Sequence, residues 1–174
     1  MKRITVQQAF QKKYPEWIDL VISRSREGRA NAMPVGWSTI ASGSPVLYAV
    51  AIHHRHYTAQ LIQETKEFVI AAPSQELAQA VLYCGTHSGH QGDKMGPSGL
   101  QLVEAAVVSA PLVAGAVYNL ECTLHAQHRT GDHILFVGEV VAAHADEKAG
   151  KRLLNFGNNA WARAKMAPDS VFRF

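Results

Sequence analysis

The stretch from Val117 to His144, VYNLECTLHAQHRTGDHILFVGEVVAAH, contains the pattern that decides the fold. Between Leu120 and Gln127, apolar and polar residues alternate strictly, which predicts a half-buried β-strand with one apolar and one polar face. The residues Arg-Thr-Gly-Asp at 129–132 then supply turn chemistry, and an apolar run resumes at Ile134. The stretch therefore predicts a long antiparallel hairpin with strands over 117–128 and 133–144.

Turn residues separate further apolar runs at short, regular intervals upstream of this hairpin, and no repeat or low-complexity tract interrupts them. We expect strands over 17–23, 33–41, 46–52, 68–72 and 101–108. Short helices are expected over 6–12, 58–65, 74–82 and 159–165, the second of them starting at Thr58 as its capping residue. Many short strands and few helices predict a mainly β fold, an antiparallel barrel or sandwich with peripheral helices, in one domain over 1–174.

The composition excludes several classes of protein. With 47% hydrophobic and 18% charged residues in 174, the chain is globular rather than disordered. No apolar run approaches the roughly 20 residues of a membrane-spanning helix. The N-terminus leads into polar Gln7 and Gln8 rather than a secretory segment. We therefore expect a cytoplasmic protein that does not bind membranes.

The cysteine count and the charge distribution narrow the range of partners. Cys84 and Cys122 are too few for a disulfide framework, so we expect two buried free thiols. The formal net charge is only +3, and the basic residues are scattered except around Arg24, Arg26 and Arg29. This pattern argues against nucleic-acid binding and suits a small anionic ligand better.

The first stretch that carries candidate chemistry is NAMPVGWST at 31–39, followed by Ser-Gly-Ser-Pro at 42–45. Gly36 stands in the interior of an expected strand, where glycine often marks a bulge or the close approach of a ligand or another backbone. An ordinary edge strand with a kink would explain the same residues.

The second stretch is HHRHYT at 53–58, between an expected strand and an expected helix. Helix-start amides, the Thr58 hydroxyl and the Arg55 guanidinium could converge there on a phosphate. The chain has no dinucleotide-binding glycine fingerprint. These histidines match no helix-based zinc motif and include no carboxylate, so we expect no metal; solvated histidines remain the plain alternative.

The third stretch, CGTHSGHQGDKMG at 84–96, is a loop rich in glycine and hydroxyl groups. Such a loop can bring backbone N–H groups close to an anionic or polar ligand while Lys94 adds charge. Cys84, His87 and His90 suggest zinc, but a fourth ligand would have to come from elsewhere and the loop needs no metal.

Together, in this order, the three stretches resemble the flavin reductase-like family of FMN-binding split barrels, and most closely its flavoredoxin-like branch. The resemblance runs from about residue 30 to residue 157. It includes an Arg-x-x-Thr step at 55–58, a Ser-Gly-x-x-x-Asp-Lys loop at 88–94 and Gly-Asp-His at 131–133. Two departures concern substrate identity more than flavin binding: Met95 stands where an aromatic often follows the lysine, and the positions of His53 and His54 are usually less rich in histidine.

The resemblance implies an antiparallel, Greek-key-like split barrel that binds FMN. It assigns Trp37, Ser38 and Thr39 to the flavin ring and ribityl chain, and it places Arg55, Thr58 and Lys94 at the phosphate. The remaining cofactor-binding residues that it implies are Asn31, Gly36, Ser88 and Gly89, the last two closing the pocket. His133 is the catalytic candidate, facing nicotinamide or a second flavin, although an exposed turn histidine is the alternative.

The activity implied is that of an NAD(P)H-dependent flavin reductase, in which NADH or NADPH gives hydride to FMN. Because isoalloxazine is itself the redox agent, no general acid or base is obligatory. Two alternatives stay open: an electron carrier that holds FMN for a redox partner protein, and a haem-binding barrel that uses His53, His54 or His56. The resemblance also implies a homodimer with the site near the subunit interface.

Overall fold

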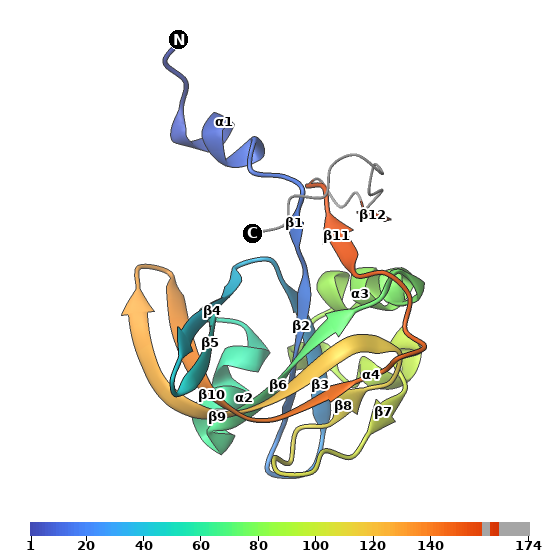
Figure 1. The fold of residues 1–174 in the computed structure, drawn as a ribbon. Helices are drawn as coiled ribbons and strands as arrows, with labels where there is room; N and C mark the ends of the chain where they lie inside the picture. Colours follow the sequence, from blue (N-terminus) through green and yellow to red (C-terminus); the bar gives the residue numbers. More distant parts are fainter. Residues whose placement is uncertain (158–160, 164–174) are drawn as a thin grey trace.

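The computed structural model describes residues 1–157 and the backbone of residues 161–163. Its main element is a seven-stranded antiparallel sheet with strand order β3-β2-β6-β9-β10-β5-β4 (Figure 1). The expected mainly β, antiparallel fold is confirmed. The strands are β2 (Asp19–Arg24), β3 (Ala30–Val35), β4 (Ser38–Gly43), β5 (Val46–His53), β6 (Glu67–Pro73), β9 (Ala116–Thr130) and β10 (His133–Ala145).

The two edges of this sheet, β3 and β4, are consecutive in the sequence and are joined by Gly36 and Trp37 alone. The sheet must therefore curl until its edges meet at this corner. The single strand expected over 33–41 is wrong, because the chain turns here and forms two strands. A Cβ on Gly36 would lie 2.5 Å from the Glu16 carboxylate, so a larger residue at this corner would require the Glu16 side chain to move.

The long hairpin is confirmed as β9 and β10, which curve together along the barrel (Figure 1). Gly131 takes a positive φ of 66° in its turn, a conformation that glycine adopts without strain. The expectation of a half-buried β9 is wrong at Glu121, which lies on the polar face yet is fully buried. Backbone amides of residues 106–108 cover this carboxylate, so both faces of β9 are packed at that point.

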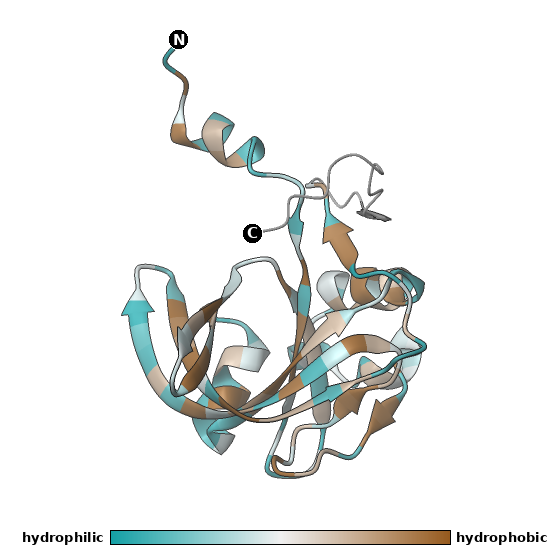
Figure 2. Ribbon diagram, in the orientation of Figure 1, coloured by the Kyte–Doolittle hydropathy of each residue, from teal (hydrophilic) through white to brown (hydrophobic). Residues whose placement is uncertain are grey.

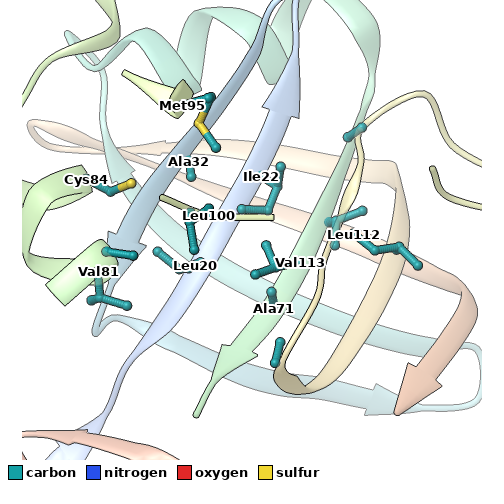
Figure 3. Packing of buried hydrophobic residues seen from close by; sticks show 14 of the residues in the cluster. Leu20, Ile22, Ala32, Ala71, Val81, Cys84, Met95, Leu100, Leu112 and Val113 are labelled. Atoms are coloured by element: carbon teal, nitrogen blue, oxygen red, sulfur yellow. The ribbon is translucent and has the colours of Figure 1, made fainter. Parts of the chain in front are cut away.

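Alternate side chains of the central strands pack into two separate hydrophobic cores. Val21, Phe68 and Ile70 pack inside the barrel against α2 (Tyr57–Thr65). Their neighbours Leu20 and Ile22 point to the other face, where α3 (Ala78–Thr86) and α4 (Met95–Ser98) cover the sheet with Val81, Cys84 and Met95 (Figure 3). This arrangement buries both cysteines as free thiols, as expected.

The observed helices near the N-terminus and beside the sheet agree with the expected ones, except at their ends. The N-terminal helix forms as α1 (Val6–Gln11), which buries no residue and lies away from the sheet (Figure 1). Helix α2 begins one residue earlier than expected, with His56 rather than Thr58 at the N-cap. The segment expected as a helix over 74–82 starts as the short 3₁₀ helix η1 (Gln75–Leu77) and continues into α3.

Two expectations near the periphery are wrong. The strand over 101–108 shrinks to β7 (Leu102–Val103), paired with β8 (Leu112–Val113), because the amides of 106–108 bind Glu121 instead of a strand. The helix over 159–165 is replaced at its centre by β12 (Trp161–Arg163), which pairs with β11 (Leu153–Asn155) beside β1 (Glu16–Trp17). The rest of that segment lies outside the described residues.

The distribution of polar and apolar residues agrees with this arrangement of strands. Figure 2 shows apolar residues along the central strands and a hydrophilic far end of the β9–β10 hairpin. Among the described helices, none is long and apolar enough to cross a membrane.

Candidate functional site

Two adjoining hollows lie beside β3. The first, about 240 Å³, is enclosed by β3, the start of α2 and the loop that follows α3; its lining includes Asn31, Tyr57, Thr58, Lys94 and residues 84–89. The second, about 170 Å³, extends to the Gly36 corner and the end of β5; its lining includes Val35, Gly36, Trp37, Ala51, His53 and His133. Both share Met33, Pro34 and His56, so together they form one elongated site.

The first hollow contains a buried polar atom that lacks a partner. Asn31 is 2% exposed, and its Nδ2 donates a hydrogen bond of 2.8 Å to Thr58 Oγ1. Among the described residues, nothing donates to Asn31 Oδ1. Such an orphaned acceptor costs free energy unless a ligand or water satisfies it. The Thr58 hydroxyl, which accepts from Asn31, keeps its own proton to donate.

The loop that closes this hollow is shaped around Gly89. A Cβ at this position would lie 2.5 Å from both Asn31 Oδ1 and Tyr57 Cδ1. Arg29 donates to the Gly89 carbonyl at 3.2 Å and stacks over the Tyr57 ring at 4.7 Å, and Ser88 caps the following turn by accepting from the His90 amide. The loop thus brings its backbone against β3 and α2, which only glycine permits.

The Lys94 side chain stabilises the same loop through two hydrogen bonds. Lys94 is 7% exposed, and its ammonium donates to the carbonyls of Cys84 at 2.9 Å and His87 at 3.0 Å, where α3 ends. These are carbonyls that the helix itself leaves without partners. Burial lowers the pKa of Lys94 from its usual value. The residue therefore contributes both to loop structure and to positive charge at the hollow.

The second hollow has an aromatic wall. The ring centroids of Trp37 and His133 lie 4.9 Å apart, and those of His53 and His133 lie 5.3 Å apart, edge to face. Trp37 is 52% exposed, and its carbonyl accepts a hydrogen bond from the Ala51 amide. His133 Nδ1 lies 2.7 Å from Asp132 Oδ1, and this hydrogen bond is the main cause of the lowered pKa of Asp132.

The structure brings most, but not all, of the sequence-predicted residues together. Asn31, Thr58, Ser88, Gly89 and Lys94 line the first hollow, and Gly36, Trp37 and His133 line the second. Arg55 is exposed next to the site and lines neither hollow. The Ser38 and Thr39 side chains are used elsewhere: Ser38 Oγ donates to Asp19 Oδ2 at 2.7 Å, and the Thr39 hydroxyl to the Ile40 carbonyl. Their binding roles stay predictions.

Sequence reasoning missed several residues of the site. Met33 and Pro34 belong to the quoted 31–39 stretch, but their apolar side chains gave no chemical signal. His56 and Tyr57 lie next to Thr58 and could have been found from that proximity. Arg29 could not, because the contact with Gly89 joins residues 60 positions apart.

The donors and the orphaned acceptor fit an elongated ligand with an anionic end and polar hydroxyls. Helix α2 points its N-terminus at the first hollow, where Thr58 and Lys94 add a hydroxyl and a cation; such ends attract anions. Apolar and aromatic side chains continue along the second hollow, which suits a planar ring. In the part of the chain that the structure describes, no group of three or more His, Cys, Asp or Glu could hold a metal ion.

Comparisons with known proteins identify the family of the chain. The sequence profile of the family described as Flavin reductase like domain matches residues 12–163. An uncharacterized protein of Archaeoglobus fulgidus is 41% identical over 145 residues, covering 82% of this chain and 81% of that protein.

Two solved structures are similar over nearly the whole chain. An FMN-binding protein from Thermus thermophilus with bound 1-cyclohex-2-enone has a TM-score of 0.80 at 31% identity and covers 97% of this chain and 100% of its own. Flavoredoxin of Desulfovibrio vulgaris has a TM-score of 0.84 at 26% identity, with 99% and 98% covered. The resemblance drawn from the sequence is confirmed, and the chain belongs to the flavin reductase-like family, with the fold of the FMN-binding split barrels.

Proposed function

We propose that the chain binds FMN along the two joined hollows and is an NAD(P)H-dependent flavin reductase. The observation that carries the proposal is the elongated site itself, with an anion-attracting hollow that contains an orphaned acceptor and an adjoining hollow with an aromatic wall. The family description and the FMN-binding relative from Thermus thermophilus support the choice of ligand.

The first hollow would hold the phosphate and the polar chain of FMN. Backbone amides at the start of α2 and the Thr58 hydroxyl would donate to phosphate oxygens, with Lys94 and the nearby Arg55 adding positive charge. Asn31 Oδ1, which lacks a donor, would accept from a ribityl hydroxyl. Ser88 and Gly89 would close this end and keep water from the polar chain.

The second hollow would hold the ring. Bound FMN would supply the redox centre, since isoalloxazine accepts a hydride from reduced nicotinamide. Met33 and Pro34 would pack on the ring, and Trp37, with about half of its surface open, would leave a face for nicotinamide. Because Asp132 accepts from His133 Nδ1, the other ring nitrogen of His133 is available to hydrogen-bond the second substrate.

The test is spectroscopic. The visible spectrum of the purified protein is recorded with and without added FMN, and NADH and then NADPH are added anaerobically. Bound flavin that bleaches with one nicotinamide is the expected result. A protein that binds no flavin would contradict the whole proposal, and a haem spectrum would favour the histidine-ligated alternative.

A flavoredoxin-type electron carrier is the second candidate, favoured by the structural similarity to flavoredoxin of Desulfovibrio vulgaris. In that case FMN would be held tightly and would stay oxidised with either nicotinamide, but would be reduced by a partner protein. Either function is compatible with the homodimer that the sequence resemblance implies, and size-exclusion chromatography with light scattering tests that state.

A further inference from the structure

Four histidines gather at the second hollow and form what we call the histidine cluster: His53, His54, His56 and His133. The ring centroids of His53 lie 4.6 Å from His54, 5.5 Å from His56 and 5.3 Å from His133. His53 ends β5, His54 and His56 lie between β5 and α2, and His133 begins β10. Three of them, all but His54, line the hollow.

Hydrogen bonds fix one nitrogen of three of these rings. Asp132 accepts from His133 Nδ1 through its carboxylate and from His54 Nδ1 through its carbonyl, both at 2.7 Å. The Arg55 amide donates to His53 Nδ1 at 3.2 Å. In each case Nε2 is the nitrogen that remains for a ligand. In His54 and His133 protonation adds a second donor at Nε2, whereas His53, whose Nδ1 accepts, already presents its proton at Nε2.

The charges around the cluster are mostly positive. The groups that face it from the packed elements are Arg55 on its own segment, His90 and Lys94 from the neighbouring loop, and Asp132 at the hairpin turn. Lys13 lies 5.7 Å from the Trp37 ring at the rim and pairs with Glu16. Asp132 pairs with His133 and also attracts His53, so a single carboxylate faces the four rings.

The positive charges of the cluster and its neighbours act on the pKa of His56. Burial lowers the pKa of His56, and the charges of His53, His133, Lys94 and His90 lower it further. Positive charges that oppose one another in this way are relieved by an anion. Among the described residues, no group of three or more His, Cys, Asp or Glu side chains could hold a metal ion.

We infer that the histidine cluster is an anion site, distinct from the end of the site that would hold the FMN phosphate, and that it binds the phosphate or carboxylate group of a second ligand. Binding takes up a proton, because the anion favours the charged form of the rings. Affinity therefore falls as pH rises through the histidine range, by about tenfold per pH unit for one proton.

This inference rests on the proposed function only in assigning the anion to the second substrate. A nicotinamide dinucleotide carries phosphates, and a small organic acceptor can carry a carboxylate. Sulfate and benzoate serve as probes of the two chemistries, since neither changes charge between about pH 5.5 and about 8.5.

The experiment follows histidine side chains of the purified protein by NMR across that pH range, with sulfate, benzoate or chloride at matched ionic strength. We expect the anion to raise the pKa of His53, His56 or His133 by about 0.5 unit or more. A double variant, His53→Gln with His56→Gln, should lose most of the shift. The matched control, His128→Gln, replaces an exposed histidine of β9 outside the cluster and should keep it.

Each outcome decides the matter. A shift with sulfate alone supports a phosphate-bearing ligand, with benzoate alone a carboxylate, and with both a general anion site. No shift, or an equal shift at the exposed His125 and His128, overturns the inference. Flavin content is measured separately by absorbance, so that a protein without flavin but with these shifts would contradict the proposed function and leave the anion site standing.

Discussion

Substituting Gly89→Ala tests the first hollow most directly. The new Cβ would lie 2.5 Å from Asn31 Oδ1 and Tyr57 Cδ1, whereas apolar contacts settle near 3.5 Å, so about 1 Å of movement is required. Tyr57 is held between Arg29 and His90 and cannot easily move. Overpacking of this kind costs about 1–3 kcal/mol, or about 3–9 °C in melting temperature for a chain of this length.

The substitution should weaken FMN binding as well as folding. Moving Asn31 would weaken its bond to Thr58 and displace its unpartnered acceptor in the first hollow, so we expect FMN affinity to fall about 10- to 100-fold, equivalent to about 1.4–2.8 kcal/mol. Fluorescence titration with FMN measures this change, and differential scanning calorimetry measures stability. Gly43→Ala on β4, where a Cβ meets nothing within 4 Å, is the matched control. Equal FMN affinity in the two folded variants would refute the reasoning.

Three further predictions concern the scaffold. Burial would raise the pKa of Glu121, but its hydrogen bonds with three backbone amides and with His144 outweigh burial and lower the pKa to about 2. The free energy of unfolding of the wild type should therefore fall by about 3 kcal/mol as pH drops from about 4.5 to about 2. Glu121→Gln should remove this acid dependence, as measured by urea denaturation. Asp19→Asn, which removes the buried carboxylate of the ion pair with partly exposed Arg152, should lose about 3 kcal/mol, whereas exposed Glu147→Gln should stay within about 0.5 kcal/mol of wild type. Burial raises the pKa of both cysteine thiols, that of Cys122 to about 12, so a thiol reagent should label Cys84 and Cys122 only on unfolding; fast labelling at pH 8 would contradict their packing.

The parts of the fold that local patterns determine were predictable. The β9–β10 hairpin followed from strict alternation and a turn at Gly131, both of which act over a few residues. The strand expected over 101–108 failed because Glu121, more than ten residues away, captures its amides. A carboxylate on the polar face of a strand looks solvent-exposed in sequence, and only the tertiary structure shows that a loop folds over it.

The site was predictable where the residue type is itself chemical. Lys94 was identified because it stands in a glycine-rich loop, and Thr58 because a hydroxyl at a helix start suits an anion, whereas Asn31 was assigned by resemblance. Ser38 was assigned to the flavin by resemblance, yet its hydroxyl is bound to Asp19, 19 positions away. Asp19 is buried, and the residues that bond to it lie far from it in the sequence, so no local pattern predicts its role.

The two bonds that Lys94 donates have a consequence for how fast a ligand can bind. They fix the loop after α3 within the protein alone, so the walls of the first hollow stand in place before any ligand arrives. Association then requires no ordering of this segment and loses little conformational entropy there. The association rate of an anionic ligand should therefore be set by diffusion and by attraction to the positive charges near the first hollow. This rate should fall as added salt screens the attraction.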